Sequence, residues 1–282
     1  MGKPINTVTH DVIYRPFIKE NPPSIGNSVP VDVNVEIDRF PVFCQDIKLF
    51  DTRESWSIYR EGEEYIWVNA REPSEFFWAA RFKRRMTTVI VYCRERFLSI
   101  ADGRKLVYNP MTYPLDQFLL MYALAERGGA ILHSCAVELG GGGVVLPGRS
   151  GAGKTTISRL LASRGHRMLS DDRVVVRKIN DAFHAYGTPW AGEGKIAENR
   201  KLPLKGLLFL QKSDDNRLER LTPAAAFKRL MPVTSIPWFD EEVLPSALSF
   251  CESLISNIPA YDLHFRPDDA VVDLLEASAA TL

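Results

Sequence analysis

Residues 143–156 read Gly-Val-Val-Leu-Pro-Gly-Arg-Ser-Gly-Ala-Gly-Lys-Thr-Thr, a short apolar run followed by a glycine-rich turn. The apolar run predicts a buried strand, and the apolar residues within 155–164 recur at helical spacing up to Gly165. The turn from Gly148 to Thr155 fits G-x-x-x-x-G-K-[ST], the phosphate-binding P-loop, in the strand-to-helix context that this motif needs. A glycine-rich surface loop could match by chance, but strand, spacing, Lys-Thr pair and helix all agree. The stretch therefore predicts a nucleotide site.

The chemistry of phosphate binding explains these residue types. Glycines let the backbone curl so that successive N–H groups point at phosphate oxygens, and the positive end of the helix dipole adds to the attraction. We expect Lys154 to reach the outer phosphates and the Thr155 hydroxyl to bind a magnesium ion. The predicted nucleotide-binding residues are Gly148, Arg149, Ser150, Gly151, Ala152, Gly153, Lys154, Thr155 and Thr156.

The composition is that of an ordinary globular protein. Its 282 residues suffice for one large domain or two smaller ones, and 35 basic and 35 acidic residues give a formal net charge of zero. This balance argues against a nucleic-acid partner. The four cysteines lack C-x-x-C spacing, which disfavours zinc and disulfides and favours a reducing compartment. We see neither a signal pattern nor an apolar stretch of membrane-spanning length, so we expect a soluble cytoplasmic protein.

The N-terminal part of the chain has the pattern of a β-rich domain. Residues 1–30 are rich in Pro, Asn and Ser and predict an extended arm. Residues 31–37 alternate strictly between apolar and polar, which predicts a half-buried strand. Further strands are expected around the turn at 61–63 and the turn at Asp102-Gly103. Many aromatic residues indicate an antiparallel sheet with an aromatic core, so 31–111 is expected to form one domain.

Residues 112–282 are expected to form the P-loop domain. A helix is predicted at 114–127, and the strand at 130–139 should turn back to run beside the P-loop strand. The remaining expected elements are strands at 167–170, 174–176 and 206–210 and helices near 223–230, 244–257 and 267–277.

Two adjacent acids, Asp171 and Asp172, follow the short apolar strand after the P-loop helix. Magnesium that bridges the outer phosphates needs a carboxylate, which P-loop enzymes supply from the end of a neighbouring strand. In an extended segment the two side chains point to opposite sides, so one could hold metal while the other faces the acceptor. A polar turn closing a strand is the alternative, and the P-loop upstream favours the functional interpretation.

His133 is a further candidate because its strand should lie beside the P-loop strand. A histidine close to two aspartates and a phosphate could titrate near neutrality and assist proton transfer. Taken by itself, a histidine on an apolar strand is more often a hydrogen-bonded core residue.

Three segments together resemble the catalytic domain of HPr kinase/phosphorylase. They are His133-Ser134 on its strand, the P-loop at 148–155, and residues 164–174, which read Arg-Gly-His-Arg-Met-Leu-Ser-Asp-Asp-Arg-Val. The resemblance covers about residues 128–180. It extends more loosely to about 275 through 187–193, Gly-Thr-Pro-Trp-Ala-Gly-Glu, as in HPr kinase-related serine kinases. The core of that family resembles phosphoenolpyruvate carboxykinase, which implies an α/β (α+β) fold with a P-loop kinase core, here with a β-rich N-terminal domain.

The resemblance also implies roles for individual residues. Asp171 would take the proton from a serine hydroxyl, while His133 would help to set its charge and contact phosphate. Asp172 and Thr155 would serve the metal, and Glu193 is the candidate for a later glutamate that approaches it. Lys154 would neutralise phosphate charge during transfer. ATP as substrate and Mg²⁺ follow from these roles.

The chain also differs from the family pattern. It has Ser134 where the family usually has Gly, and Thr155 where it usually has Ser. The family segment after the aspartates, linked to phosphate removal and docking of the carrier protein, is not recognisable, and the N-terminal half is unlike that of HPr kinases. The resemblance therefore implies nucleotide binding and phosphoryl transfer to a peptide, protein or small hydroxyl compound, rather than to HPr. HPr kinases are hexamers, so a homo-oligomer is among the expectations.

Three functions stay open at this point. The first is a kinase that moves the γ-phosphate of ATP to a hydroxyl, with Asp171 as general base. The second is a nucleotide-dependent binding or sensor module, in which the aspartates only hold metal and the aromatic N-terminal sheet is the partner surface. The third is a carboxykinase-like enzyme, which no arginine-rich substrate site supports. Transfer of phosphate to an added hydroxyl acceptor separates the first from the second.

Overall fold

The computed structural model describes residues 6–7, 12–17, 30–39, 42–43, 47–69, 78–101, 104–280 and 282. The chain divides into two compact units. The first comprises Met1–Asp11, Glu20–Glu126 and Trp238–Val243, and the second Val12–Lys19, Arg127–Pro237 and Leu244–Leu282. Within the described residues, no helix is both long and apolar enough to span a membrane. The described residues of the predicted arm are Asn6–Thr7 (strand β1), Val12–Phe17, which coils into a 3₁₀ helix, and Pro30.

The sheet of the first unit has the strand order β2-β7-β6-β5-β4-β3, in which β2 and β7 are parallel and the other neighbours antiparallel. Its strands are β2 (Asp32–Ile37), β3 (Lys48–Asp51), β4 (Ser57–Glu61), β5 (Glu64–Asn69), β6 (Trp78–Lys83) and β7 (Thr88–Cys93). The predicted turn between β4 and β5 is confirmed, with Gly62 at a φ of 60° that glycine adopts readily. The predicted alternation of burial along β2 is wrong, because its first half is exposed at the edge of the sheet.

A smaller sheet joins β1 to β9 (Arg104–Val107) and β8 (Leu98–Ala101). The turn expected at Asp102-Gly103 lies outside the described residues.

Helix α1 (Leu115–Glu126) belongs to the first unit, although we expected it in the P-loop domain. The predicted helix is confirmed, and its Phe118 and Tyr122 side chains are buried against the aromatic core. The Phe118 ring lies 6.4 Å from Trp67, and the Tyr122 ring 5.2 Å from Tyr65. Burial of aromatic surface therefore ties α1 to the N-terminal sheet, and the expected boundary at 111 moves to Glu126.

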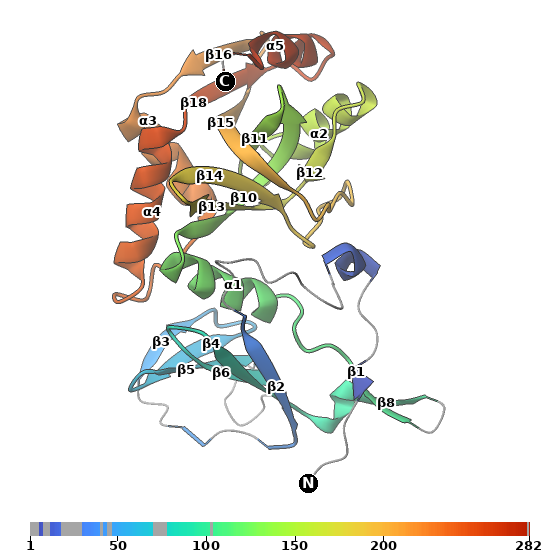
Figure 1. The fold of residues 1–282 in the computed structure, drawn as a ribbon, viewed down its shortest axis with the longest axis vertical. Coiled ribbons are helices and arrows are strands. Elements are labelled where there is room, and N and C mark those ends of the chain that lie inside the picture. The colour runs from blue at the N-terminus through green and yellow to red at the C-terminus, as the bar shows by residue number, and fades with distance from the viewer. Residues whose placement is uncertain are drawn as a thin grey trace. The chain divides into compact units, whose positions relative to one another are not determined.

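The second unit is built on a larger sheet whose order is β11-β10-β13-β14-β15-β18-β16 (Figure 1). Its members are β10 (Gly129–Leu139), β11 (Gly142–Pro147), β13 (Arg173–Ile179), β14 (Ala182–Gly187), β15 (Lys201–Lys212), β16 (Arg217–Arg220) and β18 (Ala260–Phe265). Two short strands, β12 (Met168–Ser170) and β17 (Thr234–Ser235), also pair with β10. Because β11 pairs with β15 as well as β10, the path from β11 through β10, β13, β14 and β15 closes on itself.

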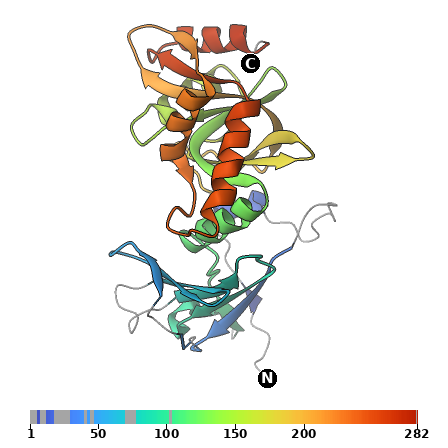
Figure 2. The same cartoon turned by 90° about the vertical axis from the view of Figure 1, so that its left-hand side faces the viewer.

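Two hydrophobic cores lie on this sheet, and each contains residues of two of the helices drawn in Figures 1 and 2. One contains residues of α3 (Pro223–Leu230) and α4 (Leu244–Asn257), and the other contains residues of α2 (Lys154–Ser163) and α5 (Ala270–Ser278). Strand β11 contributes to both, with Val145 in the first core and Val144 and Leu146 in the second. The P-loop strand is thus buried on both faces, which confirms the mixed α/β fold with a P-loop strand in its centre.

Candidate functional site

The P-loop leaves β11 at Pro147 and enters α2 at Lys154. Gly151 and Gly153 have φ angles of 79° and 105°, which disfavour any side chain. At Gly153 an added Cβ would also lie 2.5 Å from the Phe265 ring. These two glycines therefore allow the tight curl that a phosphate-binding loop needs.

Lys154 is 7% exposed, and its ammonium folds back onto the loop. Nζ donates hydrogen bonds to the carbonyl oxygens of Gly148 at 2.9 Å and Arg149 at 3.3 Å. It also lies 2.7 Å from His133 Nε2. Burial lowers the pKa of Lys154, and the charge of Asp172 opposes this effect.

His133 lies between the cationic side chain of Lys154 and the anionic side chain of Asp172. The atom Nε2 that meets Lys154 also lies 3.0 Å from Asp172 Oδ1. One ring nitrogen carries either a proton or a lone pair, so Nε2 can donate to Asp172 or accept from Lys154, but not both. His133 Nε2 therefore has a hydrogen bond with only one of these two neighbours at a time.

Asp171 is 3% exposed, and both of its carboxylate oxygens are held by backbone amides. Gly192 N–H donates to Oδ1 at 2.7 Å, and Gly194 N–H donates to Oδ2 at 2.6 Å. Because these bonds fix the side chain, Asp171 is an oriented carboxylate with free lone pairs.

Asp172 has other partners. It lies with Asp171 in a bend and not in the extended segment that we expected, and both acids line one cavity. Besides His133, it contacts Arg173 Nη1 at 2.9 Å through Oδ2. Burial alone would raise the pKa of Asp172. The His133 hydrogen bond and the charges of Arg173 and Lys154 outweigh this effect and hold the pKa below its ordinary value.

A cavity of about 570 Å³ brings these groups together. Its lining residues are His133, Ser150, Gly151, Gly153, Lys154, Thr155, Thr156, Asp171, Asp172, Gly192, Glu193 and Lys212. Both candidate acids, the histidine, the lysine and most of the P-loop therefore face one space. The sequence interpretation missed three residues: Gly194, whose amide fixes Asp171, and the cationic residues Arg173 and Lys212. Of the three, only Gly194 has a sequence signal, because it is the second glycine in the short segment 192–194.

The cavity also carries the oxygen donors that Mg²⁺ prefers, on Thr155, Asp172 and Glu193. Among the residues that the structure describes, no three His, Cys, Asp or Glu side chains gather closely enough to hold a metal ion by themselves. Mg²⁺ sites in phosphate-handling enzymes commonly use one or two carboxylates and complete the shell with phosphate oxygens and water. The donor set fits such a site.

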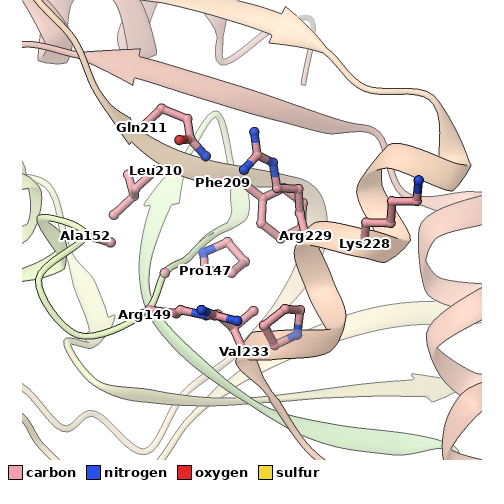
Figure 3. A pocket seen from close by; sticks show the side chains of 11 residues that line it. Pro147, Arg149, Ala152, Phe209, Leu210, Gln211, Lys228, Arg229 and Val233 are labelled. Carbon is pink, nitrogen blue, oxygen red and sulfur yellow. The ribbon is translucent and has the colours of Figure 1, made fainter.

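The remaining P-loop residues, Gly148, Arg149 and Ala152, line a second cavity of about 390 Å³. Figure 3 shows Arg149 extending from the loop toward Val233. Lys228 and Arg229 of α3 also line this cavity, and Arg229 is paired with Asp262 at 2.9 Å. Arg149 thus lines this second cavity and is not among the residues that line the cavity of the catalytic candidates.

Comparisons with known proteins find HPr kinases among the relatives that match a short part of the chain. The chain is 38% identical over 65 residues to HPr kinase/phosphorylase of Leptospira biflexa serovar Patoc, covering 23% of this chain and 20% of that protein. It is 44% identical over 50 residues to HPr kinase/phosphorylase of Peptoclostridium acidaminophilum, covering 18% and 16%. The matched segment thus spans about a fifth or less of these relatives.

Two further comparisons cover more of the chain. The structure of the Hpr(Ser) kinase/phosphatase from Coxiella burnetii aligns with 54% of this chain and 88% of that one, at 14% identity and a TM-score of 0.32. The family model described as "SynChlorMet cassette protein ScmC" matches residues 111–265. That match extends over more than half of the 282 residues and contains the P-loop, His133, both aspartates and Glu193. The chain belongs to the family of SynChlorMet cassette protein ScmC, and part of it is HPr kinase-like.

Proposed function

We propose that this protein is an ATP-dependent kinase that transfers the γ-phosphoryl group to a hydroxyl of a peptide, a protein or a small compound. The observation that supports this most directly is the placement of Asp171. Its carboxylate is fixed by two backbone amides and faces the same cavity as Lys154 and the P-loop. A phosphate cradle with an oriented carboxylate beside it has the parts that phosphoryl transfer needs.

The P-loop would hold the phosphates of ATP. Backbone N–H groups of the loop and the N-terminal end of α2 attract phosphate oxygens. Lys154 lies within the same cavity, and its ammonium would exchange the carbonyls of Gly148 and Arg149 for phosphate oxygens. A charge-assisted contact of this kind is stronger than the contacts to neutral carbonyls.

Asp171 would act as the general base. The acceptor oxygen attacks phosphorus, its proton passes to a free lone pair of the Asp171 carboxylate, and the bond to the leaving ADP oxygen breaks. The Gly192 and Gly194 amides keep the carboxylate in one orientation throughout. Positioning and charge neutralisation supply most of the rate enhancement of phosphoryl transfer, and the base adds a further factor.

His133 and Asp172 would regulate the charge around the γ-phosphate. If Lys154 moves to phosphate, His133 Nε2 is free to donate to Asp172. Thr155, Asp172 and Glu193 would hold Mg²⁺, which neutralises charge on the phosphate oxygens when bound.

The proposal is tested by offering labelled ATP with Mg²⁺ to the full chain together with peptide libraries and small alcohols. We expect a phosphorylated product, detected by mass spectrometry, whose formation depends on Asp171. Tight ATP binding without transfer to any hydroxyl would contradict the kinase proposal and favour a nucleotide-dependent binding module.

A further inference from the structure

The cavity beside the P-loop contains a second lysine, Lys212, to which the kinase chemistry described above assigns no role. Lys212 is the last residue of β15, and its side chain is exposed. Among the described residues that line this cavity, the only other lysine or arginine is Lys154. Within the part of the chain that the structure describes, no hydrogen bond or ion pair involves the Lys212 ammonium. All three of its donors are therefore available to a ligand.

The pairing of the strands places Lys212 at the same edge of the sheet as the P-loop. Strand β15 pairs in parallel with both β11 and β18, so the carboxyl ends of these three strands lie together. The P-loop leaves β11 at this edge after Pro147, and Lys212 ends β15 there. Because ligands of α/β sheets bind outside the carboxyl ends of the strands, Lys212 lies where a bound nucleotide is expected.

The alternation of side chains along β15 shows on which face of the sheet Lys212 lies. Leu207 and Phe209 belong to the hydrophobic core that contains residues of α3 and α4. Leu208 and Leu210 belong to the core that contains residues of α2 and α5. Since successive residues of a strand point to opposite faces, Lys212 shares the face of Leu208 and Leu210. That face carries α2, the helix whose N-terminal end completes the P-loop.

The charges that line the cavity leave a need for a second cation. Three carboxylates line it, those of Asp171, Asp172 and Glu193, and ATP carries more negative charge than one Mg²⁺ neutralises. Lys154 supplies one positive charge, while Arg173 is paired with Asp172. Phosphoryl transfer depends on neutralising the charge of both the transferred and the leaving group. A second ammonium in the same cavity meets this need.

The strand order also indicates which phosphate Lys212 meets. Strand β11, which carries the P-loop, pairs with β10 on one side and with β15 on the other. Asp171, the proposed base, follows β12, and β12 pairs with β10. In-line transfer puts the leaving diphosphate on the side of the γ-phosphate opposite to the base. That is the side of β15, from which Lys212 reaches the cavity.

We propose that Lys212 is a catalytic residue that stabilises the leaving group, an inference that rests on the kinase function proposed above. Its ammonium donates hydrogen bonds to oxygens of the β-phosphate. When the bond between the γ-phosphorus and the bridging oxygen breaks, the electron pair stays on the ADP oxygen, and the ammonium offsets the charge that develops there. Lys212 keeps its proton throughout, so its role is electrostatic. Lys154 and Lys212 then hold the phosphates from two sides of the P-loop strand.

The first test measures binding of ATP and of ADP, each with Mg²⁺, to the full chain by calorimetry, which needs no acceptor. Lys212→Met should weaken both nucleotides equally, by about 3- to 10-fold, because both carry the β-phosphate and water screens an exposed charge. Lys201→Met is the matched control, since Lys201 is an exposed lysine that begins the same strand outside the cavity. Equal effects of the two substitutions, or a loss for ATP alone, would overturn the contact with the β-phosphate.

The second test separates a catalytic contact from one that only binds. In single-turnover experiments at saturating ATP and acceptor, Lys212→Met should lower the transfer rate by about 10-fold, because charge on the leaving oxygen grows in the transition state. Lys212→Arg keeps the positive charge and should recover most of this rate. A Lys212→Met variant that binds more weakly but transfers at the wild-type rate would overturn the catalytic role.

The two tests together distinguish this inference from the kinase proposal. If the wild-type chain transfers phosphate and Lys212→Met behaves like Lys201→Met, only the role of Lys212 is wrong. If the wild-type chain binds nucleotide but transfers no phosphate, the kinase proposal fails and the catalytic role falls with it. Thermal unfolding of the Lys212 variants should match that of the wild type, because the side chain is exposed.

Discussion

The backbone amide of Gly194 donates a hydrogen bond of 2.6 Å to Oδ2 of Asp171, across 23 positions of sequence. The amide of Gly192 holds the other oxygen of the same carboxylate. At both positions a side chain would crowd Asp171, since an added Cβ would lie 3.2 Å from Oδ2 at Gly192 and 2.6 Å at Gly194. The segment after β14 therefore fixes the position of the Asp171 carboxylate, the proposed general base.

Gly194→Ala should displace Asp171 without touching the P-loop. A misplacement of about 1 Å can cost on the order of 10²-fold in rate, so we expect transfer to fall by about 10- to 100-fold. Nucleotide affinity should stay within about threefold, because no phosphate contact changes. Gly206→Ala is the control, since a Cβ at Gly206 meets its nearest atom at 3.6 Å. Full activity of Gly194→Ala would contradict the role of this amide.

Asp171→Asn removes the charge and the proton acceptor while keeping the shape. We expect ATP and Mg²⁺ to bind about as before and transfer to fall by roughly 10²- to 10⁴-fold, the usual contribution of acid–base catalysis. Asp172→Asn should instead lose metal affinity together with rate. The measurements are nucleotide affinity with magnesium, and phosphate transfer, on both variants.

An asparagine at 171 also places an NH₂ group against one of the two glycine amides, which lowers stability by about 1–3 kcal/mol. Thermal unfolding of the variant must therefore be measured, and activity compared below its transition. Wild-type transfer by Asp171→Asn, or a loss of nucleotide and metal as large as that of Asp172→Asn, would show that the two roles are wrongly divided.

Lys154→Met should weaken ATP binding by about 10- to 100-fold, because a charge-assisted contact to phosphate is worth roughly 1.5–3 kcal/mol. Arg149→Ala removes the same charge from the same loop, but that side chain lines the other cavity. We therefore expect Arg149→Ala to stay within about threefold of wild type. Calorimetry with ATP and magnesium compares the two; an equal loss would mean that overall charge, not the position of Lys154, determines affinity.

The buried cysteines give a prediction for pH dependence. Burial raises the pKa of Cys135 to about 11 and that of Cys251 to about 12. Above the ordinary thiol pKa of about 8.5 the unfolded chain loses these protons while the folded chain keeps them. Stability should then fall as pH rises toward 11, by about 1.4 kcal/mol per pH unit for each thiol.

Cys135→Ala should consequently lower the free energy of unfolding, measured in urea, by less at pH 10 than at pH 8. A thiol-specific disulfide reagent should also react slowly with the native protein at pH 8, because roughly one Cys135 in 10³ is ionised. A Cys44→Ser background is needed, since Cys44 lies outside the described residues. Rapid native labelling would contradict the burial of these thiols.

Local patterns were enough to predict much of the second unit. The P-loop, the β10–β11 hairpin and helix α3 each have a signal within a short window: glycine spacing, adjacent apolar runs, or a proline after a capping threonine. Thr222 indeed caps α3 through Ala225 N. The placement of His133 beside Lys154 also followed, because a hairpin brings its two strands together.

The features that were missed depend on long-range contacts. Helix α1 was assigned to the wrong unit because the sequence around Phe118 and Tyr122 does not indicate which sheet these residues pack against. The role of Gly194 depends on a segment folding back over Asp171, and that of Lys212 on β15 pairing with β11. Neither residue spacing nor hydrophobic periodicity indicates contacts between residues this far apart in the sequence.

The contact between Gly153 and Phe265 has a consequence for synthesis of the chain. Phe265 ends β18, and its ring occupies the space that a side chain at 153 would need. Strand β11 likewise pairs in parallel with β15, more than fifty residues later. During translation the P-loop sequence therefore leaves the ribosome well before the strands that brace it. We expect nascent chains that stop short of residue 265 to lack nucleotide affinity, however long they are given to fold.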